Sequence, residues 1–191
     1  MPNLSQRTRD SRIDPRHRKR WLEQAVAKNP KSVALLVSLA SLRELEGQYQ
    51  EAERLYRHIL DLSQEDIVPL NNLAWLTALR GGKASDALDL INRAIERTGP
   101  APELLDTRAI VYLAAGQNSA AIDDLNKAIA SDRSGPKLFH LAQAYLKDKK
   151  RDQARTALQE ARDAGLVDAG QLHPLEKGSY EQMLADLAQR N

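Results

Sequence analysis

The chain has 191 residues, of which 42% are hydrophobic but only 4% aromatic, and it contains no cysteine. Disulfides, thiolate catalysis and cysteine-based zinc sites are thereby excluded, and the abundance of alanine and leucine favours packed helices over a β-sandwich. The formal net charge of +2 is unevenly placed, because residues 1–31 carry nine Lys and Arg against three acids, a net +6, which leaves −4 on the remainder.

The N-terminal segment, MPNLSQRTRDSRIDPRHRKR, contains no apolar stretch of the kind found in secretory signals. No other segment approaches the ~18 uninterrupted apolar residues of a membrane-spanning helix. We therefore expect the chain as written to stay in the cytoplasm, with a disordered basic tail over residues 1–13. The next segment, 14–31, is predicted to be a single helix.

A short phrase then recurs four times, as GQYQEAERLY (47–56), GKASDALDLI (82–91), GQNSAAIDDL (116–125) and, more weakly, KKRDQARTAL (149–158). Two series of alanines share its period of 33–35 residues: Ala40, Ala74, Ala109 and Ala142, and Ala52, Ala87, Ala121 and Ala154. Apolar residues at i, i+3, i+4 and i+7 flank each phrase and indicate a helical hairpin. The predicted hairpins cover residues 33–66, 67–101, 102–134 and 135–167. The alanines are expected where two helices cross closely.

The turn inside each hairpin has its own signal. Gly47, Gly82 and Gly116 stand where the first helix must end, and glycine readily takes the left-handed conformation that ends a helix. Lys149 stands at the corresponding place in the fourth hairpin, so that turn is expected to be less well defined.

A helix–turn–helix period of 34 residues with small residues at two fixed places resembles the tetratricopeptide repeat. LNNLAWL (70–76) is similar to the first helix of that repeat, and LDTRAIVYLAAGQNSAAIDDLNKAI (105–129) is similar to a whole one, although Arg108 replaces an apolar residue. The resemblance implies an all-α fold, a right-handed α-solenoid of helical hairpins, acting as a non-catalytic protein-binding scaffold.

Both ends of the chain depart from the period. WLEQAVAKNP (21–30) resembles a second helix of a repeat with no first helix before it, which would leave an apolar N-terminal edge open. Residues 168–191 are expected to cap the solenoid. Ser179 and Gln182 form a capping-box pattern, which predicts a last helix over about 180–189. This segment resembles the end of a long bacterial repeat array, so we expect the C-terminal part of a larger protein.

No catalytic or metal-binding pattern emerges from the sequence. His17, His58, His140 and His173 are scattered, and His173 before Pro174 is expected only to start a helix. The GGK of 81–83 lies between two helices and lacks the other residues of a phosphate-binding loop. The pair Asp123–Asp124 is interpreted as solvated surface charge. We therefore predict that the protein is not an enzyme and has no cofactor and no metal.

The faces of the first helices that point away from their packing partners are expected to line a concave groove. Aromatic and aliphatic side chains among amides fit the binding of a peptide or helix from a partner protein. The predicted partner-binding residues are Val37, Ser38, Ser41, Asn71, Asn72, Trp75, Leu79, Asp106, Thr107, Ile110, Leu113, Phe139, His140, Gln143 and Lys147. Of the basic and asparagine positions that clamp a C-terminal carboxylate in similar domains, only Asn72 is present, so chaperone C-termini are not expected partners.

Two alternatives remain open from the sequence. The groove can be filled internally by the basic head, the last helix or another copy. The main alternative function is a self-association or assembly module whose groove or open N-terminal edge packs against another copy or the rest of its parent protein. The segment RHRKR (16–20) favours a third hypothesis, weak nucleic-acid binding, although Trp21 beside it is expected to pack and no groove-reading motif accompanies it.

Overall fold

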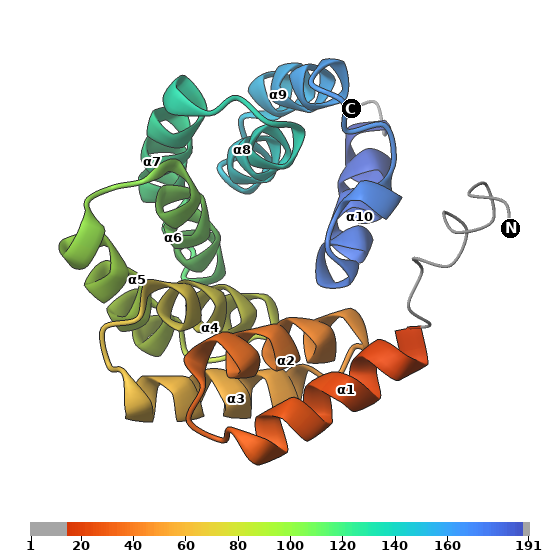
Figure 1. The fold of residues 1–191 in the computed structure, drawn as a ribbon. Coiled ribbons are helices and arrows are strands. Elements are labelled where there is room, and N and C mark those ends of the chain that lie inside the picture. Colours follow the sequence, from red (N-terminus) through yellow and green to blue (C-terminus); the bar gives the residue numbers. More distant parts are fainter. Residues whose placement is uncertain (1–14, 189–191) are drawn as a thin grey trace, which may run out of the picture. The chain divides into compact units, whose positions relative to one another are not determined.

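The structure, a computed structural model, describes residues 15–188, and all regular secondary structure within that range is helical (Figure 1). The predicted basic tail, 1–13, lies outside the described residues. The chain divides into two compact units, residues 1–64 and 65–191. The first unit contains α1 (Pro15–Lys28), α2 (Val33–Leu45) and α3 (Tyr49–Leu62). The second contains α4 (Ile67–Leu79), α5 (Ala84–Thr98), α6 (Pro102–Ala114), α7 (Asn118–Ser131), α8 (Gly135–Lys147), α9 (Arg151–Asp163), the short 3-10 helix η2 (Ala169–Gln171) and α10 (Pro174–Ala188).

In the first unit, α2 and α3 form a hairpin and α1 packs against α2. Two ion pairs join α1 to α2, one between Arg43 Nη2 and Glu23 Oε1 at 2.6 Å and one between Lys19 Nζ and Glu46 Oε1 at 2.8 Å. Leu22 faces inward and is buried, whereas Trp21 is 63% exposed. Our expectation that Trp21 packs was wrong, because neighbouring positions of a helix face different sides and Leu22 takes the inward one.

The two alanine series lie at the helix crossings, as predicted. All eight side chains have no exposed surface: Ala40, Ala52, Ala74, Ala87, Ala109, Ala121, Ala142 and Ala154. A larger side chain at any of these places would push two backbones apart, since protein interiors are packed as densely as organic crystals. The alanines therefore set the spacing within and between hairpins.

The turns follow one hydrogen-bond pattern even where the sequence varies. Gly47 and Gly116 have the expected positive φ of 71° and 73°, but in the second hairpin Gly81 (φ 72°) takes this place. The prediction for Gly82 was wrong by one residue; Gly82 is instead needed for close approach, because a Cβ there would lie 2.6 Å from Thr77 Cγ2.

The fourth turn corrects a second expectation. Lys149 adopts the left-handed conformation itself, with φ 62°. Its N–H donates to Leu146 O at 3.0 Å, and the next N–H, of Lys150, donates to Tyr145 O at 2.8 Å. These bonds match those that close the glycine turns, so this turn is formed as fully as the others, with the steric cost of a lysine in that conformation.

An ion pair between α6 and α7 explains why Arg108 stands where the repeat usually has an apolar residue. Its Nε and Nη2 donate to the two carboxylate oxygens of Asp124 at 2.6 and 2.9 Å, and its Nη1 donates to Asn92 Oδ1 at 3.3 Å. The Asp124 side chain is only 4% exposed. The interpretation of Asp124 as solvated surface charge was therefore wrong, because its position on α7 turns it inward toward Arg108. The pair holds the pKa of Arg108 above its usual value.

The change Asp124→Asn is expected to destabilise the protein by about 1–3 kcal/mol, because it leaves a partly buried guanidinium with an incomplete partner. The neighbouring change Asp123→Asn, at an exposed position of the same helix, is the matched control and should change stability by less than about 0.5 kcal/mol. Chemical denaturation of the two variants measures the difference. Equal free energies of unfolding would contradict a structural role for the pair.

Candidate functional site

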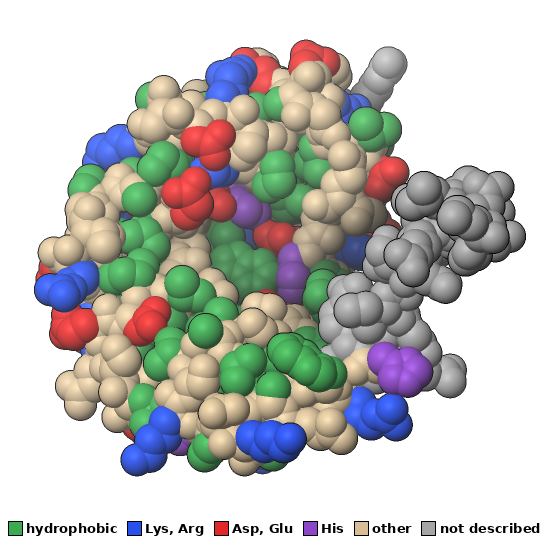
Figure 2. Space-filling model, viewed as in Figure 1, with side chains coloured by type: hydrophobic (Ala, Val, Ile, Leu, Met, Phe, Trp, Pro, Cys, Tyr) green, Lys and Arg blue, Asp and Glu red, His purple; other side chains and the backbone are tan. Residues whose placement is uncertain are grey.

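The second unit presents a hollowed inner face. Its first helices, α4, α6 and α8, lie on the inside, and its second helices, α5, α7 and α9, lie on the outside (Figure 1). We call the side of α4, α6 and α8 that is turned away from the second helices the inner face. In the hollow beside α6, α8 and α10, histidine side chains lie among acidic and hydrophobic side chains (Figure 2).

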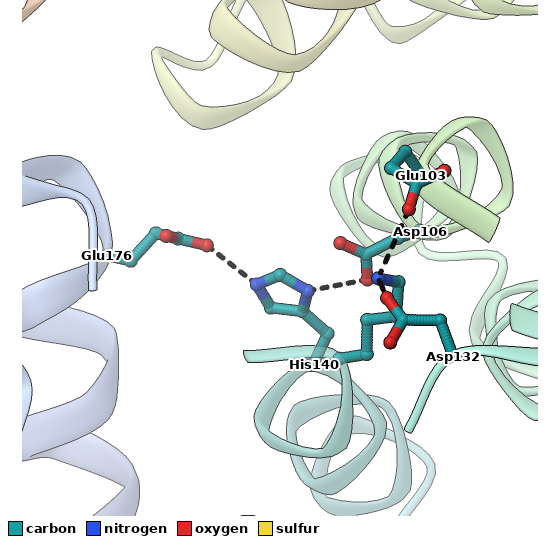
Figure 3. Close-up of polar contacts among 6 residues, drawn as sticks. Glu103, Asp106, Asp132, His140 and Glu176 are labelled. Carbon is teal, nitrogen blue, oxygen red and sulfur yellow. Dashed lines mark hydrogen bonds and ion pairs between the residues drawn. The ribbon is translucent and has the colours of Figure 1, made fainter. Parts of the chain in front are cut away.

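His140 joins three helices at this face. Its Nδ1 lies 2.7 Å from Asp106 Oδ1 on α6, and its Nε2 lies 2.7 Å from Glu176 Oε1 on α10 (Figure 3). Carboxylates only accept hydrogen bonds when ionised, so a ring that faces one on each side donates from both nitrogens and carries a proton on each. Burial would lower the pKa of His140, but the charges and hydrogen bonds of Asp106 and Glu176 outweigh it and raise this pKa to about 10.

A second ionic group lies next to the first at the start of α8. Lys137 is buried and pairs with Asp132, and its Nζ lies 3.8 Å from Glu103 Oε1 of α6 (Figure 3). The inner face near α8 therefore holds two cationic groups among four carboxylates.

The last helix covers part of the predicted groove. Phe139 has no exposed surface, and its ring meets that of Tyr180 on α10 edge-on, with centroids 5.5 Å apart. The expected exposure of Phe139 and His140 was wrong, because α10 fills the groove over them. This outcome corresponds to the alternative that the last helix occupies the groove.

Three further predicted groove residues on α6 are buried rather than exposed. Helix α6 contacts both α4 and α8, and a helix with neighbours on both sides has little free surface. The buried residues are Thr107, Ile110 and Leu113. Their side chains contribute to the core, so on α6 the polar groups near the site are Glu103 and Asp106.

Trp75 is partly exposed, as predicted, and it contacts the residue that starts α10. Its ring meets that of His173 edge-on, with centroids 4.5 Å apart. Leu175 N–H donates to His173 Nδ1 at 3.2 Å, which confirms His173 as the helix-start residue. Burial lowers the pKa of His173, in keeping with a ring nitrogen that accepts a hydrogen bond.

The predicted start of the last helix was wrong. Helix α10 begins at Pro174, and Ser179 and Gln182 lie inside it and are exposed. The capping box forms earlier, at η2, where Asp168 accepts from Gly170 N–H and Gln171 accepts from Asp168 N–H. Proline is well suited to the first turn of a helix, because its missing N–H has no partner there in any case.

The remaining predicted groove residues are on the surface in varying degree. In the first unit, Val37 on α2 is partly buried and Ser38 and Ser41 are exposed. In the second unit, the partly buried ones are Asn71, Asn72, Leu79 and Gln143, and Lys147 is exposed. Asn71 Nδ2 donates to Asn72 Oδ1 at 3.1 Å. Gln143 and Lys147 line a cleft of about 500 Å³ between α8 and α10, together with Leu146, Gly178, Ser179, Gln182, Met183 and Asp186.

Sequence reasoning missed Glu176 and Tyr180, because the last segment was interpreted only as a cap. A signal was present in the spacing, since Asp106, His140 and Glu176 follow one another at intervals of 34 and 36 residues, about one repeat each.

Within residues 15–188, no three His, Asp or Glu side chains are grouped as a metal site. None of the described helices combines the length and hydropathy that crossing a bilayer requires.

Comparison with protein families identifies the repeats. The family model described as Tetratricopeptide repeat matches residues 18–67 and 76–137, which is more than half of the chain. Tetratricopeptide repeat protein 7A of Homo sapiens is 28% identical over 117 residues, and Tetratricopeptide repeat protein 8 of Caenorhabditis elegans is 28% identical over 99 residues. These matches cover 61% and 52% of this chain but only 14% and 19% of the two relatives.

Solved structures share the fold at low sequence identity. TTC0263, a thermophilic protein of the same repeat class from Thermus thermophilus, superposes with a TM-score of 0.69 at 19% identity, covering 87% of this chain and 89% of that one. Cut9 with Hcn1, from the APC/C hetero-tetramer, gives a TM-score of 0.71 at 17% identity, covering 90% of this chain and 33% of that one. MamA gives 0.61 at 18% identity, covering 80% and 95%. The all-α solenoid of helical hairpins predicted from the sequence is confirmed.

The protonated state of His140 predicts a pH dependence of stability. Because its folded pKa of about 10 lies above the ordinary value of 6.5, the stabilisation is fully present below pH 6.5 and is lost as the pH rises through 10. We expect the difference in free energy of unfolding between the wild-type protein and His140→Gln to shrink by more than about 1 kcal/mol from pH 7 to pH 10.

The exposed His58 supplies the control for this measurement. The variant His58→Gln should follow the wild-type pH profile, since His58 is exposed and its Nε2 lies 3.4 Å from a backbone oxygen, Pro30 O. Denaturant titrations at closely spaced pH values give both profiles. If the wild-type and His140→Gln profiles run parallel up to pH 10, the imidazolium is absent.

Proposed function

Because the chain belongs to the tetratricopeptide repeat family, whose fold is in general a protein-interaction scaffold, we propose that it is a non-catalytic module that binds a peptide or helix of a partner protein on its inner face. The observation that carries the proposal is the partly exposed Trp75 beside the amides of Asn71 and Asn72 on α4. Members of this family and its structural neighbours are typically scaffolds without catalytic activity.

The chemistry of this patch suits a peptide ligand. An indole buries a large area with few rotatable bonds, and such anchors carry a large share of the binding energy in protein interfaces. Amide side chains donate to and accept from peptide groups, so they can pair with the backbone of a bound segment. Asp106 on the neighbouring helix is already hydrogen-bonded to His140, so it borders this patch as part of that ionic group.

The change Trp75→Ala is expected to weaken partner binding by about 2 kcal/mol, roughly 30-fold in Kd, because it removes the anchor. Trp21→Ala is a matched control, since it removes the same side chain from α1 and leaves the inner face intact. Partners captured with the wild-type chain and identified by mass spectrometry are titrated against both variants. Unchanged affinity of Trp75→Ala, or an equal loss in both variants, would refute the anchor role.

A second candidate function is self-association through the N-terminal edge, and one observation supports it. Trp21 is 63% exposed on α1, and a tryptophan with that much free surface commonly lies in an interface. Light scattering over a concentration series is expected to give a mass above that of the monomer for the wild-type chain and the monomer mass for Trp21→Ser. A monomer at all concentrations would exclude this function for the chain.

The third hypothesis, nucleic-acid binding through the basic head, stays a prediction. Three of the nine Lys and Arg of residues 1–31 lie outside the described residues, and the other six, including those of RHRKR, lie in residues 15–31. Where α1 is described, Lys19 pairs with Glu46, so at least one of the basic side chains is already neutralised within the chain.

A further inference from the structure

Helix α10 meets the inner face with one side, and near its C-terminal end the carbonyls of Asp186 and Leu187 accept from Arg151 and Arg155 of α9. His173 at its start contacts Trp75 of α4, Glu176 bonds to His140 of α8, and Tyr180 packs on Phe139. Within α10, the buried residues are Glu176, Tyr180, Met183 and Leu187. Their spacing of three and four residues is that of an amphipathic helix lying in a groove. The sequence of α10 thus shows what kind of helix this surface accepts.

The position of α10 is incompletely packed. The cleft of about 500 Å³ is lined by residues of α8 and α10, among them Met183. The connection from α9, residues 164–173, is long for the fold, whereas a few residues join the helices of each repeat. Val167 in this connection is 75% exposed. Leu166 and Leu172 of the same connection are buried, so release of α10 would be a local opening of this end of the unit, of the kind that proteins undergo while the rest stays folded.

We propose that the inner face of the second unit is a helix-binding surface that α10 occupies in cis. The partner that it fits is an amphipathic helix with a carboxylate and, one turn later, an aromatic side chain, as in Glu176 and Tyr180. The partner helix replaces α10 on α8. This inference rests on the proposed function, since it names the partner class that the inner face binds.

Buried charge makes the surface selective for that pattern. When α10 leaves, His140 keeps Asp106 on one side, but its Nε2–H loses its acceptor. An apolar helix in the same place would bury this donor without a partner, and a buried donor without a partner is strongly unfavourable. A helix with a carboxylate restores the hydrogen bond, and an aromatic side chain four residues later reaches Phe139. The surface therefore rejects amphipathic helices that carry apolar or basic residues at the first position.

Competition between α10 and a partner helix sets the apparent affinity. Because α10 is tethered to the surface that it occupies, its effective concentration there is high, and a partner helix in solution must compete with it. The surface is therefore closed to weak ligands and opens when the contacts of α10 are weakened.

A synthetic peptide with the sequence of residues 172–188 tests the proposal in the full-length chain. Fluorescence anisotropy of the labelled peptide is measured with the wild-type chain, with Glu176→Ala and with the matched control Glu181→Ala, which removes an exposed carboxylate from the same helix. We expect Glu176→Ala to bind the peptide at least 10-fold more tightly than the wild-type chain and Glu181→Ala to resemble the wild type. A peptide carrying the same Glu176→Ala change should bind the opened chain at least 10-fold more weakly.

Hydrogen exchange shows whether α10 leaves alone. In Glu176→Ala, and in the second variant Tyr180→Ala, amides of α10 should exchange at least 10-fold faster than in the wild type, while those of α7 stay protected. If both variants lose protection in α7 as well, α10 is an integral part of the fold and the proposal is wrong. If α10 opens but the peptide does not bind, the surface is not a helix-binding site, which also overturns it.

The outcome is separable from that of the proposed function. Peptide binding requires no outside partner, so its failure refutes only the helix pattern, whereas unchanged capture by Trp75→Ala refutes the anchor. A dimer of Glu176→Ala that the peptide dissociates would identify the occupant as α10 of a second copy and would overturn the assignment of a foreign helix.

Discussion

Helices in the second unit can stack at a constant spacing because alanines without exposed surface lie at their crossings, among them Ala74, Ala109 and Ala142. A constant spacing places equivalent positions of successive first helices next to one another on the inner face. Asp106 of α6 and His140 of α8 are therefore brought within hydrogen-bond distance although they are 34 residues apart. The ionic group at the site depends on the small residues behind it.

The charged groups of this unit specify an arrangement more than they add stability. Burying charge is costly, and a buried pair often contributes less free energy than apolar residues of the same volume. The pair of Arg108 with Asp124 nevertheless fixes α6 against α7 through two hydrogen bonds with defined directions. His140 does the same for α6, α8 and α10, but its third member comes from outside the repeats. The arrangement around His140 therefore depends on α10, a helix that is not part of the repeats.

The hairpins, the buried alanines and most turns could be predicted because they depend on local periodicity and on the size of single side chains. Burial of Asp124 and the left-handed Lys149 could not, since the first depends on a partner 16 residues away and the second on hydrogen bonds that override residue preference. For Phe139, periodicity gives the correct face of α8 but not what lies over it. The covering helix follows an irregular connection, and a pattern in the repeats carries no information about where that helix docks.

Two histidines that stabilise α10, His140 and His173, do so in opposite protonation states. His140 must be charged to bond both carboxylates, and its stabilising contribution declines as the pH rises above 6.5 toward about 10. His173 must be neutral at Nδ1 to accept from Leu175 N–H, and because burial lowers its pKa, its contribution is present above pH 6.5 and declines as the pH falls below that value. The contributions of His140 and His173 to the stability of this contact therefore change with pH in opposite directions, and both are present near pH 6.5, the ordinary histidine pKa. We therefore expect the contact of α10 with the inner face to be strongest near neutral pH and to weaken as the pH departs from neutral in either direction.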